Sequence, residues 1–107
     1  MPVINVFVPA ERVPAPRQGE FGPAVIQACV DWLGADPVKV QCNVTPSQVV
    51  TGAPSYVEVL YRAAESRDAT AMAGFMQALD TAVQTTFGCS PRIRCMAIEP
   101  ATLWARH

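Results

Sequence analysis

The sequence predicts an α/β fold, classed as α+β in some schemes, in which two tandem βαβ units form a four-stranded sheet with two helices on one face. Strand-like and helix-like patterns alternate along the chain in the order β-α-β-β-α-β. Both predicted helices end in similar sequences, LGADP around Gly34 and FGCSP around Gly88, and the offset between the two glycines is 88 − 34 = 54. A chain of 107 residues is long enough for one domain and too short for two.

The first predicted unit begins with a strand over Val3–Val8, whose β-branched and aromatic residues are typical of a strand buried on both faces. Apolar residues then recur at helical spacing over Phe21–Leu33. Pro23 suits the first turn of that helix, and Gly34 suits the position just past its end. From Val38 to Val44 apolar and polar residues alternate, which predicts a half-buried strand.

The second predicted unit repeats this order. A strand is expected over about Tyr56–Tyr61, and Asp68 or Thr70 is expected to cap the next helix. That helix carries an apolar stripe and stops at Gly88, and a fourth strand covers roughly Arg92–Ile98. The tail that follows is expected to be ordered by packing of the Trp104 indole.

The whole chain, 1–107, is predicted to be one domain with repeat one at about 2–50 and repeat two at about 55–104. The offset between the two glycines also places Phe7 on Tyr61, Val25 on Leu79 and Cys29 on Val83. Two βαβ modules with a shared core would explain this match. Strands inside each module should then be parallel, with a right-handed crossover.

Composition excludes several classes of protein. Half of the residues (50%) are hydrophobic and only 16% are charged, which rules out a disordered chain. No apolar run approaches the roughly 18 residues of a membrane span. A net charge of −1 argues against nucleic-acid binding. As a monomer, a small chain this apolar would expose hydrophobic surface, so we expect it to form an oligomer.

The cysteines and the lone histidine argue against a metal site. There are four cysteines and no C-x-x-C, and the single histidine is His107. No basic region precedes the first apolar strand, so a signal peptide is not expected. A cytoplasmic protein with reduced, buried thiols is therefore predicted, and no cofactor is implied.

The dipeptide Met1-Pro2 carries the first chemical hypothesis. The initiator methionine is normally removed when a small residue follows, and removal would make Pro2 a free secondary amine. An α-amine has a pKa of about 7.7–8.0, and both burial and nearby cations lower it. A neutral, positioned amine is a good general base, or a nucleophile toward carbonyl groups. If Met1 is retained, the Pro2 nitrogen is an amide and the chain is predicted not to be an enzyme.

The segment Pro2–Val8, the tandem βαβ order and the ending Glu99–Trp104 resemble the tautomerase superfamily over nearly the whole chain. That superfamily includes 4-oxalocrotonate tautomerase, malonate semialdehyde decarboxylase and macrophage migration inhibitory factor. The resemblance implies an amino-terminal proline that acts as base or acid. It also implies a homotrimer, because chains with two units typically form trimers.

The same resemblance points to binding residues for a small carboxylate substrate. Arg12 is placed like an arginine that binds the substrate carboxylate in 4-oxalocrotonate tautomerase. Lys39 stands at the second-strand position where that enzyme has another arginine. Arg62 resembles the first of two arginines in malonate semialdehyde decarboxylase; Ala64 stands where the second would be. Trp104 is a candidate for the pocket wall, with core or interface packing as the alternative.

The leading functional prediction is a cofactor-independent tautomerase or isomerase that moves a proton in a small 2-oxo acid or dienol. A decarboxylase, hydratase or dehalogenase on the same scaffold is the first alternative, but the water-activating aspartate has no clear match and Asp36 is only nearby. A non-catalytic ferredoxin-like or tautomerase-like binding protein, with Pro2 incidental, is the second. Arg92 and Arg94 share one strand face, where they can bind an anion or pair with another subunit.

Overall fold

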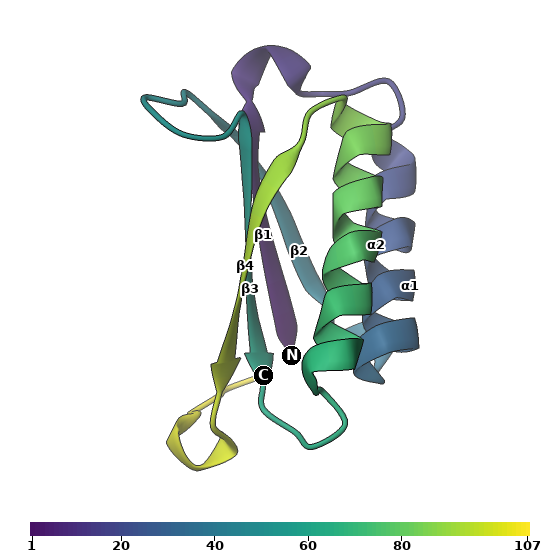
Figure 1. Ribbon diagram of the computed structural model, residues 1–107, viewed down its shortest axis with the longest axis vertical. Coiled ribbons are helices and arrows are strands. Elements are labelled where there is room, and N and C mark those ends of the chain that lie inside the picture. The colour runs from purple at the N-terminus through teal and green to yellow at the C-terminus, as the bar shows by residue number, and fades with distance from the viewer.

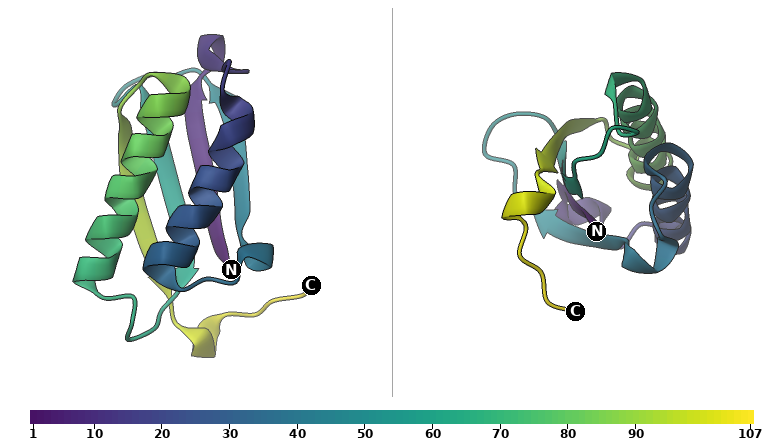
Figure 2. Two further views of the ribbon diagram at one scale, coloured as in Figure 1. Left: turned by 90° about the vertical axis from the view of Figure 1, so that its right-hand side faces the viewer. Right: turned by 90° about the horizontal axis from the view of Figure 1, so that it is seen from below.

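The computed structural model describes residues 1–107 and has two layers, a four-stranded sheet and two helices that cover one of its faces (Figures 1 and 2). The α/β prediction, with both helices on one face, is confirmed. The elements are β1 (Pro2–Pro9), α1 (Phe21–Leu33), β2 (Gln41–Ser47), β3 (Ser55–Arg62), α2 (Ala69–Phe87) and β4 (Pro91–Ile98). No helix is both long and apolar enough to cross a membrane.

The sheet has the strand order β2-β1-β3-β4. The strands within each unit are parallel neighbours, and the two units meet where β1 pairs with β3 antiparallel. In a ferredoxin-like domain each βαβ unit is split, because another strand lies between its two strands. Here the two strands of each unit are direct neighbours, so the ferredoxin-like alternative is wrong. Because β1 and β3 run in opposite directions, the sheet has two different ends. The Pro2 end holds the start of β1 and the end of β3, and the Ser55 end holds the start of β3 and the end of β1.

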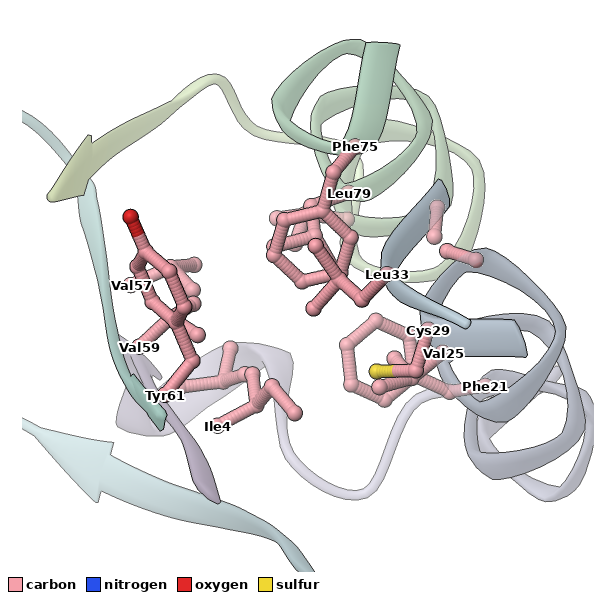
Figure 3. Packing of buried hydrophobic residues seen from close by; sticks show 14 of the residues in the cluster. Ile4, Phe21, Val25, Cys29, Leu33, Val57, Val59, Tyr61, Phe75 and Leu79 are labelled. Carbon is pink, nitrogen blue, oxygen red and sulfur yellow. The ribbon is translucent and has the colours of Figure 1, made fainter. Parts of the chain in front are cut away.

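The two helices repeat each other at the predicted offset. The five buried positions of α1 map one by one onto buried positions of α2; they are Phe21, Val25, Ala28, Cys29 and Leu33 in α1 and Phe75, Leu79, Ala82, Val83 and Phe87 in α2. Both helices end at a left-handed glycine, with φ of 61° at Gly34 and 72° at Gly88. Figure 3 shows six of these side chains between the helices and the sheet; they are Phe21, Val25, Cys29, Leu33, Phe75 and Leu79.

The strands repeat at an offset one smaller than that of the helices. The buried face of β1 begins at Pro2, and the buried face of β3 begins at Ser55, which gives 55 − 2 = 53. The predicted shift of 54 would lay the half-buried Phe7 on the buried Tyr61, which faces the other side of the sheet. A slip of one residue exchanges the two faces of a strand, so the pairing of Phe7 with Tyr61 is wrong. Ser55 is therefore the structural counterpart of Pro2.

Two local predictions need correction. The second strand begins at Gln41, because Pro37–Lys39 form a turn of 3-10 helix in which the Asp36 carboxylate accepts a hydrogen bond from the Val38 N–H at 3.1 Å. Lys39 therefore does not lie in a strand. Trp104 is 92% exposed, so the expectation that packing of its indole orders the tail is wrong within this chain.

Candidate active site

The Pro2 end of the sheet contains a cavity of about 240 Å³, called here the Pro2 pocket. Its lining comes from β1, the C-terminal end of α1, the 3-10 turn, the end of β3 and the loop that follows. The lining residues are Met1, Pro2, Gly34, Ala35, Asp36, Lys39, Arg62 and Arg67.

Strand register and helix termination bring these segments together. Pro2 lies opposite Tyr61 in the antiparallel pair, so Arg62 follows directly beside the start of β1. Gly34 adopts the left-handed conformation that ends α1 and turns the chain toward Asp36 and Lys39. Pro2 itself is buried, with less than 2% of its surface exposed, whereas Arg62 and Lys39 are exposed at the rim.

Arg67 joins two walls of the pocket, and no motif in the sequence predicts this role. Its Nε donates to the Leu33 carbonyl oxygen at 3.0 Å, and its Nη1 donates to the Arg62 carbonyl oxygen at 2.7 Å. The side chain therefore ties the last turn of α1 to the end of β3. Its only local signal was its place immediately before Asp68, the residue that caps α2 by accepting from the Ala71 N–H at 2.9 Å.

The pocket carries an excess of positive charge. Lys39, Arg62 and Arg67 face one carboxylate, Asp36, and none of them forms an ion pair, because the one salt bridge in the chain joins Arg17 and Glu20 elsewhere. Burial lowers the pKa of the terminal amine at Met1, and the three cations lower it further, while Asp36 acts in the opposite direction. Such a pocket favours a bound anion and a neutral amine.

Arg12 lies at the other end of the sheet from Pro2. It follows β1 in a short 3-10 turn, and its Nη1 donates to the Phe87 carbonyl oxygen at 3.2 Å. After Pro2, the remaining seven residues of β1 carry the chain about 23 Å toward Arg12. Arg12 thus holds the end of α2 as Arg67 holds the end of α1. Within one chain it does not reach the Pro2 pocket.

The structure therefore brings Pro2, Lys39 and Arg62 together and leaves two candidates outside. Arg12 lies at the Ser55 end. Trp104 belongs to the C-terminal tail, which follows β4 at the Pro2 end (Figure 1), but it does not line the pocket. Asp36 does line it, although the sequence placed Asp36 only near the site.

The cysteines and acidic residues form no metal-binding group. No three or more histidine, cysteine or acidic side chains lie together. All four cysteines are free, and burial raises the pKa of Cys29 to about 12 and those of Cys42 and Cys95 to about 11. These three thiols are therefore protonated near neutral pH and are poor nucleophiles.

The mixed sheet, with adjacent parallel strands in each unit, has the same fold as several solved structures. No family model and no curated protein matches the sequence. Solved structures do match. Q0 fused 4-OT, a wild-type symmetric trimer, has a TM-score of 0.81 and 20% identity over 96% of this chain and 90% of its own.

Two further structures give the same result. N1, a member of the cis-3-chloroacrylic acid dehalogenase (cis-CaaD) family, has a TM-score of 0.80 and 11% identity over 96% of this chain and 79% of its own. The macrophage migration inhibitory factor-like protein from Entamoeba histolytica has a TM-score of 0.77 and 9% identity over 99% of this chain and 96% of its own. At these identities the likeness establishes the fold, and the predicted resemblance to the tautomerase superfamily is confirmed at that level.

Proposed function

We propose that this chain, once Met1 is removed, is a cofactor-independent tautomerase that uses the Pro2 amine as general base on a small 2-oxo acid or its dienol. The burial of Pro2 in a pocket with three cations carries the proposal. The effects that lower the pKa of the Met1 amine would act on a Pro2 amine one residue deeper in the same pocket. The similarity to 4-OT, cis-CaaD and MIF-like structures supports the fold-level context.

In the proposed reaction the neutral Pro2 amine removes a proton from the enol oxygen, or from a carbon beside the carbonyl. The resulting prolinium returns the proton to another atom of the conjugated system. Arg62 holds the substrate carboxylate with two parallel N–H donors, and Lys39 adds a second positive charge. Both cations draw electron density toward the carboxylate and so stabilise the dienolate-like transition state.

A homotrimer is part of the proposal. The sheet face opposite the helices carries the half-buried Phe7 and Leu60 and the 40% exposed Met96, which have no second layer to cover them. Q0 fused 4-OT is a trimer in its solved structure. In such an assembly Arg12 and Trp104 would contact substrate only in the pocket of a neighbouring copy.

The test begins with purified, untagged protein whose intact mass shows that Met1 is absent. Pro2→Ala should lower kcat/KM for ketonisation of a 2-oxo acid enol by at least about 10²-fold and leave the oligomer intact, because it removes only the secondary amine base. Pro9→Ala, at the other end of β1, is the matched control and should retain activity. An unchanged rate in Pro2→Ala would exclude the proposal.

Asp36 supports a second candidate function. Its carboxylate lies in the Pro2 pocket and is oriented by the Val38 N–H, so it is placed to activate a water molecule there. A hydratase, decarboxylase or dehalogenase would need such a group. Turnover of a 3-halo-acrylate or of malonate semialdehyde, lost in Asp36→Asn while ketonisation persists, would select this alternative.

A further inference from the structure

The loop between β3 and α2 forms one side of the Pro2 pocket and lies at the same end of the molecule as the end of α1 (Figure 1). The loop is fixed at both of its ends. At its start the Ala63 N–H donates to the last carbonyl oxygen of β4 at 2.9 Å, and at its end Asp68 caps α2. Between these points the Arg67 N–H closes a turn by donating to the Ala64 carbonyl oxygen at 3.0 Å. The backbone of Arg67 is therefore fixed beside the pocket.

The guanidinium of Arg67 is fixed as well, by two backbone carbonyl oxygens. Its Nε donates to Leu33 at 3.0 Å, and its Nη1 donates to Arg62 at 2.7 Å. The Leu33 carbonyl lies in the last turn of α1, where no later residue of the helix can donate to it, and a positive charge suits that end of a helix. Because the guanidinium is planar and rigid, its two hydrogen bonds hold the two carbonyl groups at a set separation.

Arg62 differs from Arg67 in what its side chain contacts. The Arg62 guanidinium makes no hydrogen bond and no ion pair within the chain, and the residue is exposed at the rim of the pocket. Its N–H donors are therefore free to bind a carboxylate. Arg67 is half-buried, and its Nε and Nη1 are already bonded to backbone oxygens. One arginine is thus placed to bind the substrate, and the other to hold the first in position.

The backbone of Arg62 needs such support because it lies at the end of its strand. Arg62 is the last residue of β3, and the antiparallel pairing with β1 ends one residue earlier, at Tyr61. No strand on that side fixes Arg62. A displacement of about 1 Å between substrate and catalytic group can cost about 10²-fold in rate. A fixed bond to the Arg62 carbonyl oxygen keeps its side chain at a constant distance from Pro2.

We propose that Arg67 is a positioning residue, which holds Arg62 against the end of α1 so that Arg62 meets the substrate carboxylate while Pro2 reaches the proton. This role rests on the proposed tautomerase function. Arg67 acts through Arg62 and does not itself bind the substrate. The hydrogen bonds of Arg67 can be separated from its charge, because Arg67→Lys keeps the charge and loses the planar fork that bonds to both carbonyl oxygens.

The kinetic test compares Arg67→Lys with the untagged wild-type protein. Arg67→Lys should lower kcat/KM for ketonisation of a 2-oxo acid enol by about tenfold, because Arg62 loses its fixed position. The pH at which kcat/KM is half-maximal should stay the same, since a positive charge remains beside Pro2. Arg17→Lys, in an exposed ion pair before the start of α1, is the matched control and should leave kcat/KM unchanged.

Binding of oxalate gives a second readout that does not depend on catalysis. Oxalate is a planar anion that resembles the enolate of a 2-oxo acid and has no proton to transfer. In isothermal titration calorimetry Arg67→Lys should raise the dissociation constant of oxalate by about tenfold. In an Arg62→Met background the same substitution should change it by less than about twofold, because Arg67 acts through Arg62.

The remaining outcomes separate this role from its alternatives. A merely structural role would lower the number of oxalate sites and leave the dissociation constant unchanged, which would overturn the proposal. Additive effects of Arg62→Met and Arg67→Lys would contradict it too, since Arg67 would then bind the anion itself, and so would a wild-type protein that binds no oxalate.

Failure of the proposed reaction would give a different result. A wild-type protein that ketonises nothing, with oxalate binding about tenfold weaker in Arg67→Lys, would exclude the tautomerase and retain Arg67 as the residue that positions Arg62 for an anion. An active wild-type protein with unchanged kinetics and oxalate binding in Arg67→Lys would retain the tautomerase and exclude the positioning role. Thermal melting of each variant confirms that it is folded.

Discussion

The two βαβ units have matching helices and matching contacts at the helix ends, but they differ at the first residue of the leading strand. In each unit an arginine from the other unit's connecting loop donates to the last carbonyl oxygens of the helix, Arg67 to Leu33 and Arg12 to Phe87. One framework thus creates a pocket at each end of the sheet. The chemistry differs, because one leading strand begins with Pro2 in a pocket with three cations and the other begins with Ser55, whose hydroxyl is buried without a partner.

The largest expected effect on stability separates the two arginines. Arg67→Ala should lower the free energy of unfolding by about 2 kcal/mol, because two carbonyl oxygens lose a charged donor. Arg12→Ala, which removes one longer bond, should cost about 1 kcal/mol. Urea unfolding of both variants measures the difference, and equal losses would show that the two contacts are equivalent.

The same pair of variants distinguishes a structural role from an electrostatic one. Arg67 is among the cations that lower the pKa of the amino terminus, so Arg67→Ala should raise that pKa. Arg12→Ala should leave it unchanged, since Arg12 lies at the other end of the sheet. The pH dependence of acylation of the terminal amine reports the value. A shift of equal size in both variants would contradict a local electrostatic effect.

The two helix-ending glycines provide a smaller comparison. Gly34→Ala should cost about 1 kcal/mol, because alanine is strained at its positive φ and nothing else is within 4 Å. Gly88→Ala should cost more, about 2 kcal/mol, because its Cβ would also lie 2.8 Å from Nη1 of Arg12. In the Arg12→Ala background the two glycine substitutions should become equal, which a double-mutant cycle measures.

The smallest expected effect concerns Cys29, whose counterpart in α2 is Val83. The folded chain raises the pKa of Cys29 to about 12 from a usual value of 9.0, so the unfolded chain loses this proton first as pH rises. The stability contributed by protonated Cys29 should therefore be fully present below pH 9 and be lost as the pH rises above 9. Cys29→Val should reduce the decline between pH 9 and 10 by about 1 kcal/mol. Urea unfolding at both pH values tests this, and an identical decline in the variant would contradict it.

The elements were predictable because their signals are local. Apolar spacing and the glycines at 34 and 88 fixed both helix ends. The alignment of the strands of the two units was not predictable. The strand-to-helix connections of the two units differ in length by one residue, and this moves the offset between equivalent positions from 54 in the helices to 53 in the strands. That single residue decides whether Phe7 or Val8 is the counterpart of Tyr61.

Only the part of the candidate site that strand pairing brings together was predictable. Pro2 and Arg62 meet because the start of β1 lies beside the end of β3. Arg12 was placed by its distance along the chain from Pro2, but an extended strand carries the chain away at about 3.3 Å per residue. Arg67 was missed because it bonds to backbone carbonyl oxygens, one of them 34 residues away, and such contacts leave no side-chain pattern.

The antiparallel pairing of β1 with β3 has a consequence for protein engineering. Both chain ends lie at the Pro2 end (Figure 1), and the loop 48–54 lies at the other. A circular permutant that joins the ends and opens before position 55, with proline there, would convert the Pro2 nitrogen into an amide and create a free secondary amine at the opposite pole. The fold would stay the same, but the free amine would lie at the Ser55 end of the sheet. The chain connectivity alone would then decide which end carries the base.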